Sequence, residues 1–222
     1  MPESAVAGRT VVIAGGTSEA GRAVSRALLR GGALVIVVGR DQARLDQMAT
    51  DIPGVSTEAC DLTDEAAVMA MAARVGPIDG VVNLVGGWRG GGGLEGQHDA
   101  DYRFLEAGLT ALRHVSRAFD NSLRTSSAGR LAIVSSTATA RPLAGGANYA
   151  AVKAASEAWA RAVAQGFAKT ARDAQVPLSA ASVIFRVKSL AGLEESLADA
   201  VVALFDSPAA DINDTVITLP RT

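Results

Sequence analysis

A short apolar run, a glycine-rich turn and a helical segment follow one another near the start of the chain. The run is Thr10–Ala14 (TVVIA), and Gly15, Gly16 and Gly21 lie in the turn that comes next. In residues 22–30 the apolar side chains recur at helical spacing. Glycines permit a tight turn and a close approach of the backbone to a pyrophosphate, which amides at a helix N-terminus then bind. This order predicts the first strand and helix of a parallel α/β sheet, with an anion site between them.

Strand and helix patterns alternate along the rest of the chain. Residues 33–38 (ALVIVV) are a continuous apolar run, typical of a strand buried on both faces of a parallel sheet. Further strands are expected at 55–60, 79–85, up to 134, 178–184 and 215–219, and helices at 41–50, 65–75, 102–124, 147–172 and 194–205. A length of 222 residues, 49% of them hydrophobic, fits one domain. We predict an α/β fold, with a single Rossmann domain over residues 1–222 and a doubly wound parallel sheet of about seven strands.

Charge and hydropathy argue against several classes of partner. The net charge is −2 with acidic and basic residues interspersed, which indicates no patch for a phosphate backbone or a membrane surface. The first residues lack the basic and apolar regions of a signal peptide, and no stretch reaches the roughly 18 apolar residues of a membrane span. We expect a cytoplasmic protein that acts on a small molecule and binds neither nucleic acid nor membrane.

The chain offers little material for a disulfide or a metal site. Cys60 is its single cysteine, and its place beside a predicted strand is more typical of a small buried hydrophobe than of a nucleophile. His98 and His114 have no cysteine or histidine at the spacing of a zinc site. We expect no bound metal.

A tyrosine and a lysine four residues apart form the most reactive pattern in the sequence. Tyr149 and Lys153 would share one face of a helix. An ammonium beside a phenol favours the phenolate, so a proton normally held until about pH 10 is exchanged nearer neutrality. Ser136, just past a strand end, would offer a hydroxyl to the same substrate oxygen. A lone pair of this spacing is more often two surface residues, so its context decides.

The context resembles a known family. A serine thirteen residues ahead of the YxxxK pattern, behind a glycine-rich first turn, is similar to the short-chain dehydrogenase/reductase family over residues 10–219. The resemblance implies hydride transfer between a nicotinamide cofactor and a carbonyl or a conjugated C=N such as a quinonoid pterin. It implies that Tyr149 is the general acid/base, that Lys153 lowers its pKa and anchors the nicotinamide ribose, and that Ser136 polarises the substrate oxygen.

The first turn departs from the family pattern TGxxxGxG at its middle glycine, where this chain has Glu19. The expected cofactor contacts in this turn are Gly15, Thr17, Ser18 and Gly21. A carboxylate near the pyrophosphate would repel it. Alternatively, Glu19 points outward and stabilises the start of its own helix, where negative charge is favourable. Both interpretations stay open.

The strand ends that follow indicate the type of nucleotide. Gly39 and Arg40 replace the acid that would accept from a ribose 2′-OH, and an arginine there accommodates a 2′-phosphate. We therefore expect NADP(H) rather than NAD(H). Asp61 and Leu62 resemble the family's element at the adenine ring, although Asp61 would equally serve as N-cap of the helix at 65–75.

Residues 86–98 and 184–195 are the predicted substrate-binding elements. Asn83 and Gly86 remain from the family's NNAG, and the glycine-rich loop that follows is similar in its GGW to dihydropteridine reductases. Trp88 would stack on a substrate ring, or would only pin a loop too rich in glycine to be rigid. In residues 184–189 the family's PGxxxT has lost Pro-Gly, and Ser189 replaces its threonine as a cofactor contact.

The predicted helix at 102–124 has an unusually apolar face, and its neighbour is expected to be the helix containing Tyr149. In the family these helices pair across a twofold axis, so the resemblance implies a homodimer or homotetramer. The family's helical asparagine, part of a proton path behind the lysine, aligns with Gly108. The departures at Glu19, Gly108 and Ile184-Phe185 favour an alternative, a non-enzymic dinucleotide-binding or regulatory protein; the intact serine, tyrosine and lysine favour the oxidoreductase.

Overall fold

The computed structural model describes residues 4–219 and contains one seven-stranded parallel sheet. Its strands lie in the order β3-β2-β1-β4-β5-β6-β7. They are β1 (Thr10–Ala14), β2 (Leu34–Gly39), β3 (Val55–Ala59), β4 (Gly80–Asn83), β5 (Arg130–Ser136), β6 (Ala181–Val187) and β7 (Thr215–Thr218). The predicted fold class, a single-domain Rossmann-like sheet of seven strands, is confirmed.

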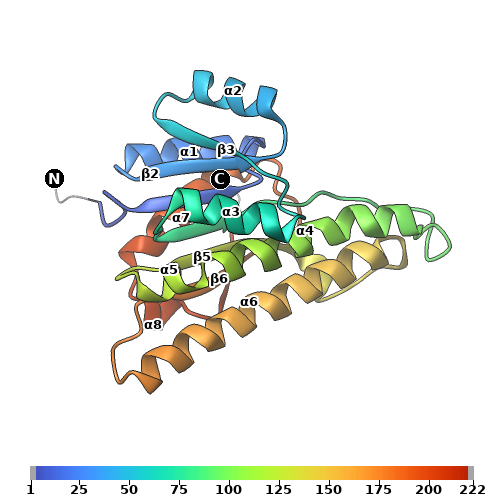
Figure 1. Ribbon diagram of the computed structural model, residues 1–222. Helices are drawn as coiled ribbons and strands as arrows, with labels where there is room; N and C mark the ends of the chain where they lie inside the picture. The colour runs from blue at the N-terminus through green and yellow to red at the C-terminus, as the bar shows by residue number, and fades with distance from the viewer. Residues whose placement is uncertain (1–3, 220–222) are drawn as a thin grey trace.

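Helices cover both faces of the sheet (Figure 1). They are α1 (Glu19–Arg30), α2 (Gln42–Asp51), α3 (Glu65–Val75), α4 (Asp99–Ala118), α5 (Asp120–Thr125), α6 (Ala147–Asp173), α7 (Glu194–Asp206) and α8 (Ala209–Ile212), with short 3-10 turns η1 (Thr137–Thr139) and η2 (Ala144–Gly146). Helices α1, α2 and α7 pack on one face and α3, α4 and α6 on the other. Within residues 4–219, no helix combines the length and the apolar character needed to cross a membrane.

The order of the strands places a crevice at the carboxyl edge of the sheet. The chain moves outward from β1 to β2 and β3, then returns to the other side of β1 with β4. At such a reversal the connecting segments diverge to opposite faces, and ligands of doubly wound folds bind between them. Helix α1 begins at this edge directly after the glycine turn.

The helix predicted at 102–124 is divided into α4 and α5, because Phe119 leaves the helical conformation at φ −103° and ψ 5°. The break lets Phe119 and Leu123 both enter the core. The apolar face of this segment is largely internal, since Leu105, Leu112 and Val115 are buried within the same chain. This face therefore gives no support to the predicted oligomer. Helices α4 and α6 do lie side by side, as expected (Figure 1).

The strand predicted at 178–184 is shifted to β6, Ala181–Val187. Ile184 and Phe185 stand at the place of the family's Pro-Gly, and both keep a backbone N–H. Proline cannot donate to a sheet ladder, so its loss allows the strand to continue. The pairing with β5 accordingly extends through Val134↔Phe185 and Ser135↔Arg186.

A buried arginine joins the opposite edge of the sheet to the helices. Arg130, the first residue of β5, is 4% exposed, and its guanidinium donates only to backbone oxygens. Nε contacts Leu204 at 2.7 Å and Nη2 contacts Ser207 at 2.9 Å, at the end of α7, while Nη1 contacts Gly129 and Ser179. Burial lowers the pKa of Arg130 to about 10. The cation thus satisfies carbonyl groups at the C-terminus of a helix, where positive charge is favourable.

Replacing this arginine should destabilise the fold. In Arg130→Met the contacted carbonyl groups lose their donors, so we expect the free energy of unfolding to fall by about 3 kcal/mol in urea denaturation. The matched control is Arg117→Met, which removes an exposed pair with Glu65. It should change the stability by less than about 1 kcal/mol. Equal effects of the two variants would contradict the structural role of Arg130.

Candidate active site

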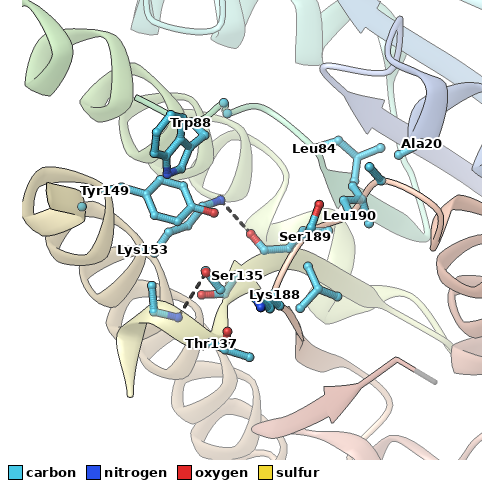
Figure 2. Close-up of a pocket in the computed structure, with 18 of the residues that line it drawn as sticks. Ala20, Leu84, Trp88, Ser135, Thr137, Tyr149, Lys153, Lys188, Ser189 and Leu190 are labelled. Atoms are coloured by element: carbon cyan, nitrogen blue, oxygen red, sulfur yellow. Dashed lines mark hydrogen bonds between the residues drawn. The ribbon is translucent and has the colours of Figure 1, made fainter. Parts of the chain in front are cut away.

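A cavity of about 1300 Å³ lies at the carboxyl ends of the central strands (Figure 2). It brings together these predicted residues: Ser18, Asn83, Gly86, Trp88, Ser136, Tyr149, Lys153 and Ser189. It does not include the predicted Gly15, Thr17, Gly21, Arg40, Asp61 and Leu62, which belong to the first turn and to the ends of β2 and β3. The cavity therefore unites the proposed catalytic groups, while the predicted adenosine contacts lie further along the same edge.

Ser136 is the last residue of β5 and is almost fully buried. Its Oγ accepts the backbone N–H of Ala138 at 3.2 Å, which caps the 3-10 turn η1. None of the hydrogen bonds found in residues 4–219 uses the Ser136 hydroxyl as donor. The serine is thus fixed by an accepted hydrogen bond and can donate its proton to an oxygen in the cavity.

Tyr149 and Lys153 lie one turn apart at the start of α6. The Nζ atom of Lys153 is 5.8 Å from the centre of the Tyr149 ring and donates to the backbone oxygen of Val134 at 2.9 Å (Figure 2). Burial lowers the pKa of Lys153 to about 8, against the opposing effect of the Glu157 carboxylate. The Lys153 side chain thus places a positive charge beside the Tyr149 ring. The arrangement suits proton exchange between the phenol and a bound oxygen atom.

Gly108 lies close to the backbone that follows β4. A Cβ atom there would be 3.1 Å from the Val85 oxygen and 3.5 Å from the Gly86 Cα, so an asparagine would require this loop to shift. A small cavity of about 20 Å³ between α4 and Lys153 is also lined by Asn83, whose buried Oδ1 has no partner among the described residues. That volume is enough for about one water molecule. The asparagine of the family pattern is therefore replaced by close backbone packing.

The first turn needs its glycines. Gly15 has φ +72°, and a Cβ on it would lie 3.0 Å from the Val85 nitrogen; a Cβ on Gly21 would lie 2.0 Å from the Gly16 oxygen. Ser18 caps α1 by accepting the Gly21 N–H at 3.2 Å. Glu19 is exposed in the first turn of α1 and also borders the cavity. Its charge is thus favourable for the helix, yet it faces the region where a pyrophosphate is expected.

Of the predicted adenosine contacts beside this turn, Arg40 and Asp61 are exposed and Leu62 is buried. Arg40 follows β2 and is exposed, and Arg44 from α2 donates to the Thr17 oxygen at 3.2 Å. Asp61 accepts from the backbone and the hydroxyl of Thr63, which with the charge of Arg40 lowers the pKa of Asp61. The N-cap of α3 is Asp64 and not Asp61, so that alternative is wrong.

The glycine-rich loop at 86–98 contacts the segment that leads into α6. Gln97 Nε2 lies 3.1 Å from the Gly91 oxygen and 3.0 Å from the Gly145 oxygen, and Gln97 Oε1 accepts the Asn148 N–H at 3.2 Å. The loop is therefore anchored beside the start of α6. Trp88 is 61% exposed and lines the cavity near Tyr149 (Figure 2).

Sequence reasoning missed several residues around the cavity, among them Gln97, Arg141 and Glu157. Arg141 lines the cavity from the loop between η1 and η2. Glu157 is buried one turn after Lys153. The spacing of four residues was the available signal for Glu157, because it places the two residues on one helix face. No local pattern shows that Arg141 lines the cavity, or that Gln97 bonds to the backbone of the neighbouring loop.

Known proteins share this sequence pattern and fold. An L-xylulose reductase from Mesocricetus auratus is 33% identical over 151 residues, which are 68% of this chain and 62% of that protein. A short chain dehydrogenase from Pseudomonas syringae has the same fold with a TM-score of 0.84 and 20% identity, covering 97% of this chain and 96% of that one. A gluconate 5-dehydrogenase from Burkholderia cenocepacia J2315, in complex with NADP and tartrate, gives a TM-score of 0.79 at 18% identity, with 96% and 94% covered.

The chain spans less than two thirds of the length of the curated L-xylulose reductases that it matches. The family model described as short chain dehydrogenase matches residues 9–176, from the strand before the glycine turn to the end of the helix that contains Tyr149 and Lys153. That match covers more than half of the chain. By this match, this chain belongs to the short-chain dehydrogenase family.

Proposed function

We propose that this chain is an oxidoreductase that uses NADP(H) to reduce a carbonyl, or a quinonoid C=N, by hydride transfer. The observation that supports this most is the convergence of Ser136, Tyr149 and Lys153 on one cavity next to the glycine turn. The family match and the relative named L-xylulose reductase, whose substrate is a ketose, favour a carbonyl over a C=N substrate.

The residues present fit a dinucleotide. The tight first turn requires glycine at positions 15 and 21, where a side chain would collide with neighbouring backbone. The first residues of α1 line the cavity, and a helix N-terminus is a site where phosphate groups bind. Arg40, with Arg44 nearby, provides positive charge for a 2′-phosphate at the end of β2. Asp61, Leu62, Asn83, Gly86 and Ser189 would complete the contacts along the edge. Glu19 is the feature that opposes tight pyrophosphate binding.

The bound nicotinamide would supply the hydride, and the chain's own residues would manage the proton. Ser136 would donate its hydroxyl hydrogen to the substrate oxygen and so polarise the carbonyl. Tyr149 would deliver a proton to that oxygen as negative charge develops on it. Lys153 would stabilise the phenolate left behind and hold the ribose with its remaining donors. Trp88 would cover the flat or apolar part of the substrate at the mouth of the cavity.

The second candidate is a nucleotide-binding regulatory protein without turnover. Glu19 at the cavity edge and the packed Gly108 favour it. The intact catalytic residues oppose it. Assembly into a homodimer or homotetramer is also a proposal, and it rests on the resemblance to the family; α4 and α6, the helices that would form the interface, lie side by side within the chain.

Cofactor choice gives the first functional prediction. NADPH should bind more tightly than NADH, and Arg40→Ala should reduce this preference by about tenfold, the value of one charge-assisted contact. Fluorescence titration of both nucleotides measures the effect. Arg103→Ala, which changes an exposed arginine on α4, is the control and should leave the preference unchanged. Equal affinities of the unmodified protein for NADPH and NADH would contradict the proposal.

Proton transfer gives the second functional prediction. Tyr149→Phe removes the phenolic proton and leaves the ring, so kcat should fall by about 10²–10⁴ while nucleotide binding is retained. Tyr102→Phe changes the chain's other tyrosine and should keep full turnover. The assay uses NADPH oxidation with a panel of ketoses and other carbonyl compounds. Full turnover of Tyr149→Phe would refute the mechanism, and nucleotide binding without reduction of any compound would favour the regulatory protein.

A further inference from the structure

A buried carboxylate lies one helical turn beyond Lys153. Glu157 is 7% exposed, and its Oε1 accepts the Ser135 hydroxyl at 2.6 Å and lies 3.1 Å from the Thr139 hydroxyl. Arg186 donates to it twice, from Nε to Oε1 at 3.1 Å and from Nη2 to Oε2 at 2.6 Å. The carboxylate therefore joins α6 to the end of β5, to η1 and to β6.

Arg186 reaches Glu157 because of the departure from the family pattern in β6. The strand continues past the place of Pro-Gly, so Arg186 pairs with Ser135 across the ladder and its side chain faces α6. Its side chain is 26% exposed, whereas that of Glu157 is 9% exposed. The two parallel hydrogen bonds form the bidentate geometry that arginine makes with a carboxylate. The pair is thus specific in orientation as well as charge.

A lysine and a glutamate four residues apart on a helix ordinarily attract each other. Here Lys153 instead donates to the Val134 oxygen at 2.9 Å, and Glu157 makes its ion pair with Arg186. Burial raises the pKa of Glu157, but the hydrogen bonds from Arg186 and Ser135 outweigh it and keep that pKa below its usual value. The carboxylate is therefore ionised, and its accepting positions are occupied.

We propose that Arg186 is a positioning residue that engages the Glu157 carboxylate and so prevents it from capturing the Lys153 ammonium. Lys153 is then free to act in the cavity, and this inference rests on the role proposed above for that lysine. The same contacts hold Ser135 and Thr139 on either side of Ser136. Arg186, which is not one of the three proposed catalytic residues, thereby determines where Lys153 and Ser136 point.

Several titratable or charged groups surround Lys153. Helix α6 contributes Tyr149 and Glu157, and β6 and its end contribute Arg186 and Lys188. The same cavity is also lined by Glu19, Arg141 and Glu194, which the variants below leave unchanged. The residues of α4 that line the cavities around Lys153 are apolar side chains and glycine. The polar side chains that β5 contributes are serine hydroxyl groups. Burial lowers the pKa of Lys153 and Glu157 raises it. Bringing the carboxylate closer must therefore raise this pKa, and neutralising it must lower it.

The test is a titration of the lysine side chains by ¹³C NMR in protein labelled at Cε. The chain's lysines are Lys153, Lys169 and Lys188, so Lys169→Arg and Lys188→Arg assign the signals. In Arg186→Gln the released carboxylate should turn to Lys153 and raise its pKa above the value of about 8 in the unmodified protein. In Glu157→Gln the pKa should fall. Arg161 lies on the same helix as Lys153 and forms an exposed pair with Asp214. Arg161→Gln should therefore leave the pKa of Lys153 unchanged.

The double variant separates positioning from a direct effect of the arginine's charge. If Arg186 acts through Glu157, Lys153 should titrate in Glu157→Gln/Arg186→Gln as it does in Glu157→Gln. A pKa raised in the double variant as much as in Arg186→Gln, or unchanged in Arg186→Gln, would overturn the proposal. Should Arg186→Gln be too unstable to titrate, Arg186→Lys, which retains charge but not the two-pronged contact, should show a smaller rise; no rise there would also overturn it.

Activity provides a second measurement. Arg186→Gln should lower kcat by about tenfold or more, and the double variant should recover part of that loss, because removal of the carboxylate removes the competing partner. Simple addition of the two single losses would contradict positioning. The titration needs neither cofactor nor substrate, so a protein that reduces no carbonyl would refute the proposed function without affecting the result for Arg186.

Discussion

The central strands β1, β4, β5 and β6 are buried on both faces, and this burial dictates where polar chemistry is placed. Side chains along them point into one or the other helical layer, both of which are apolar. Polar groups are therefore concentrated where strands begin or end. Ser135, Ser136 and Arg186 lie at the carboxyl ends, and Arg130 lies at the opposite edge. The parallel arrangement brings all the carboxyl ends to one edge, so a single cavity collects them.

Arg130, which is buried, and Arg186, which is partly exposed, show two ways of satisfying a charge inside the fold. Arg130 distributes its positive charge over backbone oxygens and has no carboxylate within ion-pair distance among the described residues. Arg186 forms an ion pair with Glu157. The hydroxyl groups of Ser135 and Thr139 contact the same carboxylate. A desolvated charge is tolerated only with such partners. The first arrangement stabilises a helix end, while the second lies one helical turn from Lys153, the lysine proposed to act in the cavity.

Each departure from the family pattern has a local structural explanation. Glu19 occupies the first turn of α1, where its charge is favourable, although it borders the cavity. Gly108 lets α4 approach the backbone after β4. Ile184 and Phe185 extend β6 by keeping the backbone donors that a proline would remove. The departures therefore change the surroundings of the active site but leave its central residues in place.

Local patterns in the sequence were enough to predict the sheet and to single out the proposed catalytic residues. Apolar runs, glycine turns and helical spacing identified the strand and helix order, and the spacing of Tyr149 and Lys153 identified a shared helix face. Only the tertiary structure decided which residues complete the site. Gln97 anchors the glycine loop to η2, and Arg186 meets Glu157 across 29 positions of sequence. Contacts between such distant segments depend on how α6 packs over β5 and β6, which no local period specifies. The break at Phe119 was missed for the same reason, since a continuous apolar period does not reveal where the core requires a helix to turn.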